Sequence, residues 1–68
     1  MTETMQPIKP YKLYLRMTRQ TPWDFSDYLG RFESKEDALR YAREYMSGRR
    51  AEYRIRHVNT GEHEDGYI

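Results

Sequence analysis

Residues 34–48 read SKEDALRYAREYMSG and carry the start, the apolar face and the end of one amphipathic helix. Ser34 is a good N-cap, because its hydroxyl can accept a hydrogen bond from an unpaired amide of the first turn. Asp37 adds negative charge at the positive end of the helix dipole. Gly48 suits the left-handed residue at which many helices stop. The stretch therefore predicts one helix from Ser34 to Ser47.

The apolar side chains of this helix share one face and need a second layer to cover them. At 100° per residue they fall within an arc of about 160°, with charged residues opposite. The members of this arc are Ala38, Leu39, Tyr41, Ala42, Tyr45 and Met46. A single helix cannot bury such a face alone, so the flanking segments are expected to form a sheet beneath it.

Segments on both sides of the helix show the period-two alternation of half-buried strands. We predict strands over residues 11–17, 26–33 and 51–58, and a short, ragged fourth strand over residues 66–68. Gly30, inside the second strand, indicates a bulge or a close approach of another segment.

These elements predict a small two-layer α+β domain with the element order β-β-α-β(-β). The loop between the first two strands makes them antiparallel. The helix returns the chain so that the third strand lies beside the first and antiparallel to it. The expected antiparallel sheet has the strand order 2-1-3-4, with the helix on one face and the other face open to solvent or to a partner.

The predicted core joins the inward side of the strands to the apolar face of the helix. Its members are Leu13, Leu15, Tyr28, Phe32, Ala38, Leu39, Ala42, Met46, Tyr53 and Ile55. Truncating a leucine buried in such a core, for example Leu39, to alanine is expected to cost about 2–5 kcal/mol.

The composition indicates one small domain without covalent cross-links. A chain of 68 residues buries only about 60% of its unfolded surface, so dimerisation is one way to add core. Residues 1–10 contain two prolines and read as a flexible arm ahead of a domain over residues 11–68. The absence of cysteine excludes disulfides and thiolate metal sites and favours a cytoplasmic location. We find no signal peptide and no apolar run long enough to cross a membrane.

The net charge is only +1, but it is unevenly distributed. All 12 Lys and Arg residues lie between Lys9 and Arg56, together with seven of the 11 acidic residues, which leaves five excess positive charges. The last residues are acidic. This pattern permits an anionic partner but falls short of the strong basic bias of a dedicated nucleic-acid-binding domain.

The open sheet face is the first candidate site. The outward positions of the strands place basic groups beside a tyrosine, a combination that binds phosphates and stacks bases. The candidate residues are Lys12, Tyr14, Arg16, Arg31, Arg54 and Arg56. The alternative is an ordinary solvated face, on which Lys and Arg keep the strands soluble.

The loop TPWDF, residues 21–25, is the second candidate. Trp23 and Phe25 could anchor a protein partner, because Trp is common among the residues that dominate binding energy. Trp23 could instead fold back and cap the core at the sheet edge. The sequence leaves both readings open.

No catalytic or metal-binding constellation emerges from the rest of the chain. His57, Glu62, His63, Glu64 and Asp65 carry ligand atoms, but their spacing matches no established site. There is no Cys, no serine elbow and no Gly-rich phosphate loop. We therefore expect no enzymatic activity, no cofactor, no metal and no small-molecule substrate.

Two interpretations of function remain. The leading one is a non-enzymatic protein-interaction module that binds another protein or a second copy of itself, because the domain is small, contains seven Tyr and one Trp, and leaves one sheet face uncovered. The alternative is a weak nucleic-acid-binding protein that uses the open sheet face.

Overall fold

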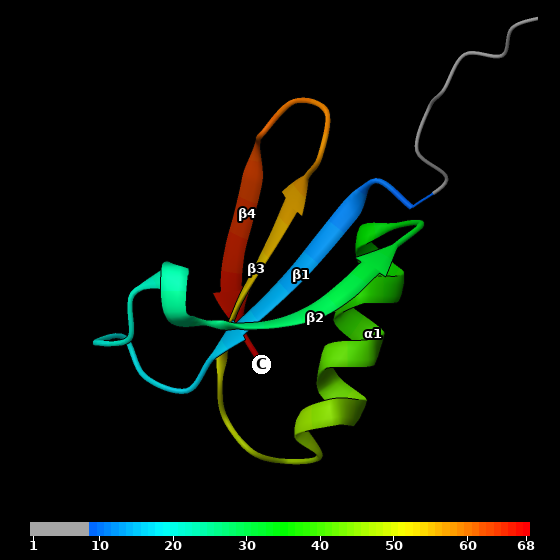
Figure 1. The fold of residues 1–68 in the computed structure, drawn as a ribbon. Helices are drawn as coiled ribbons and strands as arrows, with labels where there is room; N and C mark the ends of the chain where they lie inside the picture. Colours follow the sequence, from blue (N-terminus) through cyan, green and yellow to red (C-terminus); the bar gives the residue numbers. More distant parts are fainter. Residues whose placement is uncertain (1–8) are drawn as a thin grey trace, which may run out of the picture.

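A computed structural model describes residues 9–68 as a four-stranded antiparallel sheet with one helix packed on one face (Figure 1). Along the chain the elements are β1 (Tyr11–Arg16), the short 3₁₀ helix η1 (Trp23–Phe25), β2 (Asp27–Phe32), α1 (Lys35–Met46), β3 (Glu52–His57) and β4 (His63–Tyr67). The strand order is β2-β1-β3-β4. The predicted fold class, order and antiparallel pairing are therefore confirmed.

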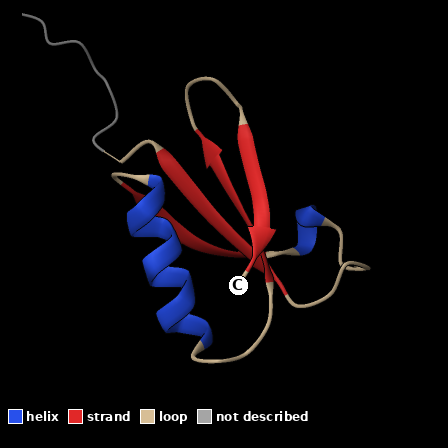
Figure 2. Cartoon of the chain, turned by 180° about the vertical axis from the view of Figure 1, so that it is seen from behind, coloured by secondary structure: helices blue, strands red, loops and turns tan. Residues whose placement is uncertain are grey.

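The central strand β1 pairs with β2 on one side and with β3 on the other. Figures 1 and 2 show α1 on one side of this sheet and η1 on the opposite side. The loop that precedes β2 therefore lies against the face that the helix leaves uncovered.

Strand β4 is longer than predicted and forms a hairpin with β3. Its tight turn is closed by two hydrogen bonds of 2.8 Å, from the Gly61 amide to the His57 carbonyl and from the His57 amide to the Glu62 carbonyl. Pairing can therefore begin at His63. This outer strand is exposed along most of its length, so its sequence, HEDGY, needs no apolar face. Without alternating apolar residues, the sequence gave no signal for a strand before Gly66.

A bulge between β1 and β2 overturns one predicted core residue. Leu13 pairs with Gly30, but the next residue, Tyr14, pairs with Tyr28, so Leu29 is the extra residue. Gly30 has φ of 114°, a conformation that suits glycine. The bulge turns Leu29 toward the core and Tyr28 to the opposite face, where its side chain is 52% exposed. The prediction that Gly30 marks a bulge is confirmed, and the prediction that Tyr28 is buried is wrong.

Helix α1 has the predicted ends. The Ser34 hydroxyl accepts a hydrogen bond of 3.1 Å from the Asp37 amide. At the other end, Ser47 and Gly48 both have positive φ, of 48° and 89°. The Ser47 amide donates to the Arg43 carbonyl at 2.9 Å and closes the last turn. The N-cap is therefore the predicted Ser34, whereas the left-handed conformation begins at Ser47, one residue before the predicted Gly48.

The core lies between α1 and the sheet. Its buried members are Leu13, Leu15, Ala38, Ala42, Met46, Ala51, Tyr53 and Ile55. Phe32 and Leu39 pack against this cluster but stay partly exposed. Seven of the predicted core residues are thus buried, and Ala51 joins them where the chain enters β3.

Two tyrosines of the predicted apolar face of α1 lie on its flank instead of its underside. Tyr41 and Tyr45 are 42% and 51% exposed. The ring of Tyr41 contacts that of Phe32 at a centroid distance of 5.2 Å and stacks on Tyr45 at 6.1 Å. The helix rests on the narrower stripe of Ala38, Ala42 and Met46, whose small residues let the backbone approach the sheet closely. The wide phenol rings are therefore left at the side.

Most of the predicted N-terminal arm, residues 1–8, lies outside the described residues. Its last two residues are described, and both accept hydrogen bonds from the domain. The Pro10 carbonyl accepts from the Val58 amide at 2.8 Å, and the Lys9 carbonyl accepts from Arg31 Nε at 2.9 Å. Within residues 9–68, no helix has the length and apolar character needed to cross a membrane.

Candidate binding surfaces

The sheet face opposite α1, here called the open face, is ordered in rows that cross the strands. Arg31 of β2, Lys12 of β1, Arg56 of β3 and His63 of β4 are consecutive cross-strand partners. Directly opposite residues have Cβ atoms about 4.5–5.5 Å apart. We call these four residues the basic row. Among residues 9–68, no carboxylate lies within 4.0 Å of a charged nitrogen of this row.

The next row along the strands combines aromatic and charged groups. Tyr28 and Tyr14, here called the aromatic pair, lie side by side with ring centroids 5.4 Å apart. Arg54 follows on β3 and donates from Nε and an η nitrogen to both carboxylate oxygens of Asp65, at 2.8 and 2.9 Å. This hydrogen bonding lowers the pKa of Asp65 below its ordinary value and raises the pKa of Arg54. Arg54 therefore already has an acidic partner.

Arg16 is also engaged within the open face. Its Nε donates to Glu52 Oε1 at 2.6 Å, and its η nitrogen donates to the Thr21 carbonyl at 2.8 Å. The guanidinium carbons of Arg16 and Arg54 lie 4.2 and 4.5 Å from the centre of the Trp23 ring. These two arginines therefore hold the loop that carries Trp23 against the sheet.

The structure brings all six predicted face residues onto the open face and divides them by role. Arg16 and Arg54 hold Glu52, Asp65 and Trp23, as described above. The others, Lys12, Tyr14, Arg31 and Arg56, have no described carboxylate at ion-pair distance. Sequence reasoning missed Tyr28 and His63, which join the same face. Gly30 was the only signal for the bulge that moves Tyr28, and the register of the β3–β4 hairpin places His63.

A hollow of about 350 Å³ lies on the open face between the aromatic pair and the loop. Its lining consists of Tyr14, Trp23, Asp24, Ser26, Tyr28, Arg54 and Arg56. Flat aromatic groups thus stand beside guanidinium groups in one depression. Arg56 belongs to both the hollow and the basic row, so the two features are continuous.

The two predicted anchors differ in burial: Trp23 packs on the open face, whereas Phe25 is exposed to solvent. Trp23 is half-buried against Arg16 and Arg54, so it fixes the loop on the open face and does not cap the core. Phe25 is 76% exposed. The turn that presents it is fixed by hydrogen bonds from the Phe25 amide to the Pro22 carbonyl at 2.9 Å and from the Ser26 hydroxyl to the Trp23 carbonyl at 2.7 Å.

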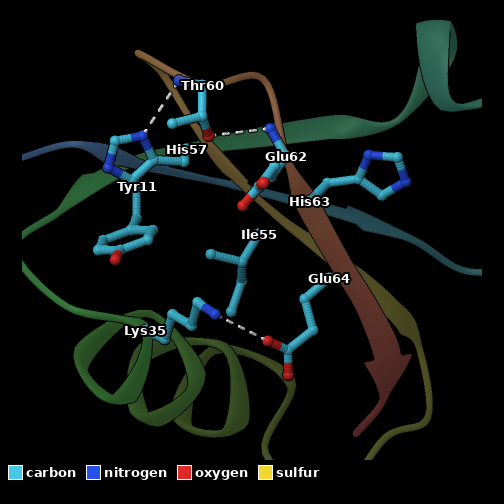
Figure 3. Close-up of a pocket in the computed structure, with 8 residues that line it drawn as sticks. All are labelled: Tyr11, Lys35, Ile55, His57, Thr60, Glu62, His63 and Glu64. Carbon is cyan, nitrogen blue, oxygen red and sulfur yellow. Dashed lines mark hydrogen bonds and ion pairs between the residues drawn. The ribbon is translucent and has the colours of Figure 1, made fainter.

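A second hollow, of about 470 Å³, lies beside the β3–β4 turn on the helix side (Figure 3). Lys35 Nζ donates to Glu64 Oε1 at 3.1 Å across it, and this contact raises the pKa of Lys35. Nδ1 of His57 accepts hydrogen bonds from the backbone amides of Asn59 and Thr60, at 3.2 and 3.3 Å. The polar groups of this hollow therefore mainly hold the hairpin turn and connect it to α1.

The histidines and acids near the end of the chain are split between the two faces of the sheet. His57 and Glu64 lie on the helix side, because their cross-strand partners are Tyr11 and Ile55. His63 pairs with Arg56 on the open face, and its ring points away from His57 in Figure 3. Residues 9–68 contain no group of three or more His, Cys, Asp or Glu residues placed to hold a metal ion.

No family model matches this chain, and no curated protein or solved structure shows significant similarity to it. Any function must therefore be inferred from the surfaces themselves.

Proposed function

We propose that this protein is a small, non-enzymatic protein-interaction module that binds a partner protein or a second copy of itself through the loop between β1 and β2. The observation that supports this most directly is Phe25, whose side chain is 76% exposed on a hydrogen-bonded turn. Phe25 lines a shallow hollow together with the exposed Met17, and adjacent exposed apolar side chains mark interaction sites more often than isolated ones do.

The loop is well suited to presenting an anchor because it is held in place from within. The contacts of Trp23 with Arg16 and Arg54 fasten one side of η1 to the sheet. The hydrogen bond from the Ser26 hydroxyl to the Trp23 carbonyl closes the turn. The backbone that presents Phe25 therefore need not be ordered on binding, which reduces the entropic cost of association.

The surroundings of Phe25 have the layout of an interface centre. A shallow hollow of about 200 Å³ is lined by Phe25, Met17 and Leu15 together with polar residues such as Thr21 and Asp27. Met17 is itself 55% exposed just beyond the end of β1. Apolar anchors bordered by polar groups are typical of the residues that dominate protein–protein binding.

The test compares the wild type with Phe25→Ala and with Tyr45→Ala as a matched control. Tyr45 is 51% exposed on the helix flank, away from the loop. Sedimentation velocity over a range of concentrations measures self-association, and affinity capture from native lysate measures other partners. Phe25→Ala should weaken the association about 30-fold or more, as expected for a dominant anchor, without lowering Tm.

Tyr45→Ala should leave the same association unchanged. A wild-type protein that stays monomeric and retains no specific partner would refute the proposal. So would a Phe25→Ala variant that associates as strongly as the wild type.

We assign the protein to the cytoplasm as part of this proposal, on the basis of its lack of cysteine.

A further inference from the structure

We propose that the open face also binds single-stranded nucleic acid, with phosphates along the basic row and bases against the aromatic pair. This inference concerns the strands of the open face and the side of the loop that faces them, whereas the function proposed above rests on Phe25, which does not line the hollow of the open face, so neither proposal depends on the other. It rests on the juxtaposition, fixed by strand register, of a row of cations with the exposed Tyr28 and the half-buried Tyr14.

The basic row is unfavourable for the free protein. Like charges directly opposite one another on neighbouring strands repel. Lys12 lies between Arg31 and Arg56 in the register, and no described carboxylate lies within ion-pair distance of the three. A bound anion would offset this repulsion.

The rest of the same face shows that charge pairing was available. Arg16 has Glu52 as its partner at 2.6 Å, and Arg54 has Asp65 at 2.8 Å. If the open face only had to be soluble, ion pairs with carboxylates along the basic row would stabilise it in the same way. The open face instead concentrates its unneutralised cations in one line across the strands, where consecutive anionic groups of a chain can reach them.

The aromatic pair supplies the second half of the site. Tyr14 and Tyr28 lie two residues along β1 and three along β2 from the basic row, which corresponds to roughly 7 Å on β1. The ring of Tyr28 is 52% exposed, and the hollow of about 350 Å³ beside it is open to a flat group. Nucleobases stack on such rings with little sequence preference. Phosphates and bases of one strand can therefore occupy adjacent tracks.

This arrangement favours a single strand over other anions. An acidic peptide would use the basic row but has no flat groups for the aromatic pair. A duplex keeps its bases stacked inside, so it would contact the cations alone. A single strand offers both phosphates and unstacked bases.

The test measures binding of the full chain to fluorescently labelled oligo-dT and oligo-U by anisotropy over a salt series. Three phosphate contacts, at Arg31, Lys12 and Arg56, predict a log–log salt slope of about −2, or about 20-fold weaker binding for a fourfold rise in salt. Lys12→Gln should reduce the size of the slope by about 0.7. Arg43→Gln removes one charge from α1 and should leave the slope unchanged.

Stacking is tested separately from charge. Tyr28→Ala should weaken binding about 5- to 140-fold through the loss of one stacked base, without changing the salt slope. Tyr45→Ala, which removes a tyrosine of nearly equal exposure (51% against 52%) from the helix flank, should have no effect. Phe25→Ala should also bind as the wild type does, so failure of either proposal leaves the other intact.

A second readout does not depend on a nucleic acid. Because Lys12 is repelled from both sides, Lys12→Gln should raise the Tm of the free protein while it weakens binding. The inference is overturned by the absence of binding at low salt or by binding indifferent to Tyr28→Ala. It is also overturned if poly-glutamate or a duplex of equal charge competes as well as the single strand does.

Discussion

Replacing Gly66 with alanine should destabilise the protein, because the new methyl group would overlap the ring of Tyr53. A Cβ built at Gly66 lies 2.5 Å from the Tyr53 hydroxyl oxygen, 2.6 Å from Cζ and 2.8 Å from Cε2. Carbon atoms in contact prefer separations of about 3.5–4.0 Å, so the ring would have to retreat by about 1 Å. The ring belongs to the buried core and has little room to move.

The size of the effect follows from two opposing contributions. Overpacking of this kind costs about 1–3 kcal/mol, while replacing glycine by alanine stabilises by about 0.4–1 kcal/mol through the unfolded chain. From the middle of the two ranges the net loss should be about 1.3 kcal/mol, which for a domain of this size lowers Tm by roughly 5–10 °C. Urea and thermal unfolding followed by circular dichroism measure both quantities.

A double-mutant cycle identifies the clash as the cause. In a Tyr53→Leu background the ring is gone, so adding Gly66→Ala should cost little or should stabilise slightly. An undiminished penalty in that background would show that the loss arises elsewhere. A Gly66→Ala single variant as stable as the wild type would refute the reasoning outright.

Three further outcomes are expected from unfolding measurements. Met46→Ala should cost about 2–5 kcal/mol, and Leu39→Ala clearly less, because Met46 is 2% exposed while Leu39 is only partly buried; an equal loss would contradict the assigned helix rotation. Ser34→Ala should cost about 0.5–2 kcal/mol through loss of the N-cap, and Ser34→Asp should restore most of it. The hydrogen bond from Arg54 lowers the pKa of Asp65, so the stability that this pair contributes is present above the ordinary Asp pKa of 3.8 and is lost as the pH falls further toward the folded-state pKa. This contribution is below about 1 kcal/mol, because both groups are partly exposed. Acid unfolding of the Asp65→Asn variant should lack it.

The fold was predictable from the sequence because its strongest signals are local. The Ser34 cap, the left-handed stop at Gly48 and the alternation of Leu13 and Leu15 each depend on a few neighbouring residues. Once one helix and three strands were located, the need to cover a single apolar face left little choice of strand order.

The errors in the core have non-local causes. An extra residue at the bulge reverses the alternation of β2, and only its pairing with β1 fixes where that residue sits. Tyr28 was therefore assigned to the wrong face. On α1, the width of the buried stripe depends on how closely the helix approaches the sheet, so Leu39 was predicted to belong to the core although it is only partly buried.

The composition of the candidate surfaces was predictable only in part. Alternation alone placed Lys12 and Arg16 on the same face. Which cation is neutralised depends on register, because Arg16 meets Glu52 across the strands while Lys12 meets Arg56. The different placements of Trp23, against the open face, and of Phe25, in solvent, depend on the path of a loop that carries no periodic pattern.

The central position of β1 has a consequence for the exchange of backbone amides with solvent. Successive amides of β1 point alternately to β2 and to β3, so both sides of this strand are hydrogen-bonded. In β2 and β4, every second amide points outward, where no further strand of residues 9–68 pairs with it. Deuterium should therefore enter the two outer strands at alternating positions, while the amides of β1 and of β3, which is also paired on both sides, exchange slowly. The sheet then opens from its edges inward, and the two inner strands, which carry Lys12 and Arg56, are the last to be released.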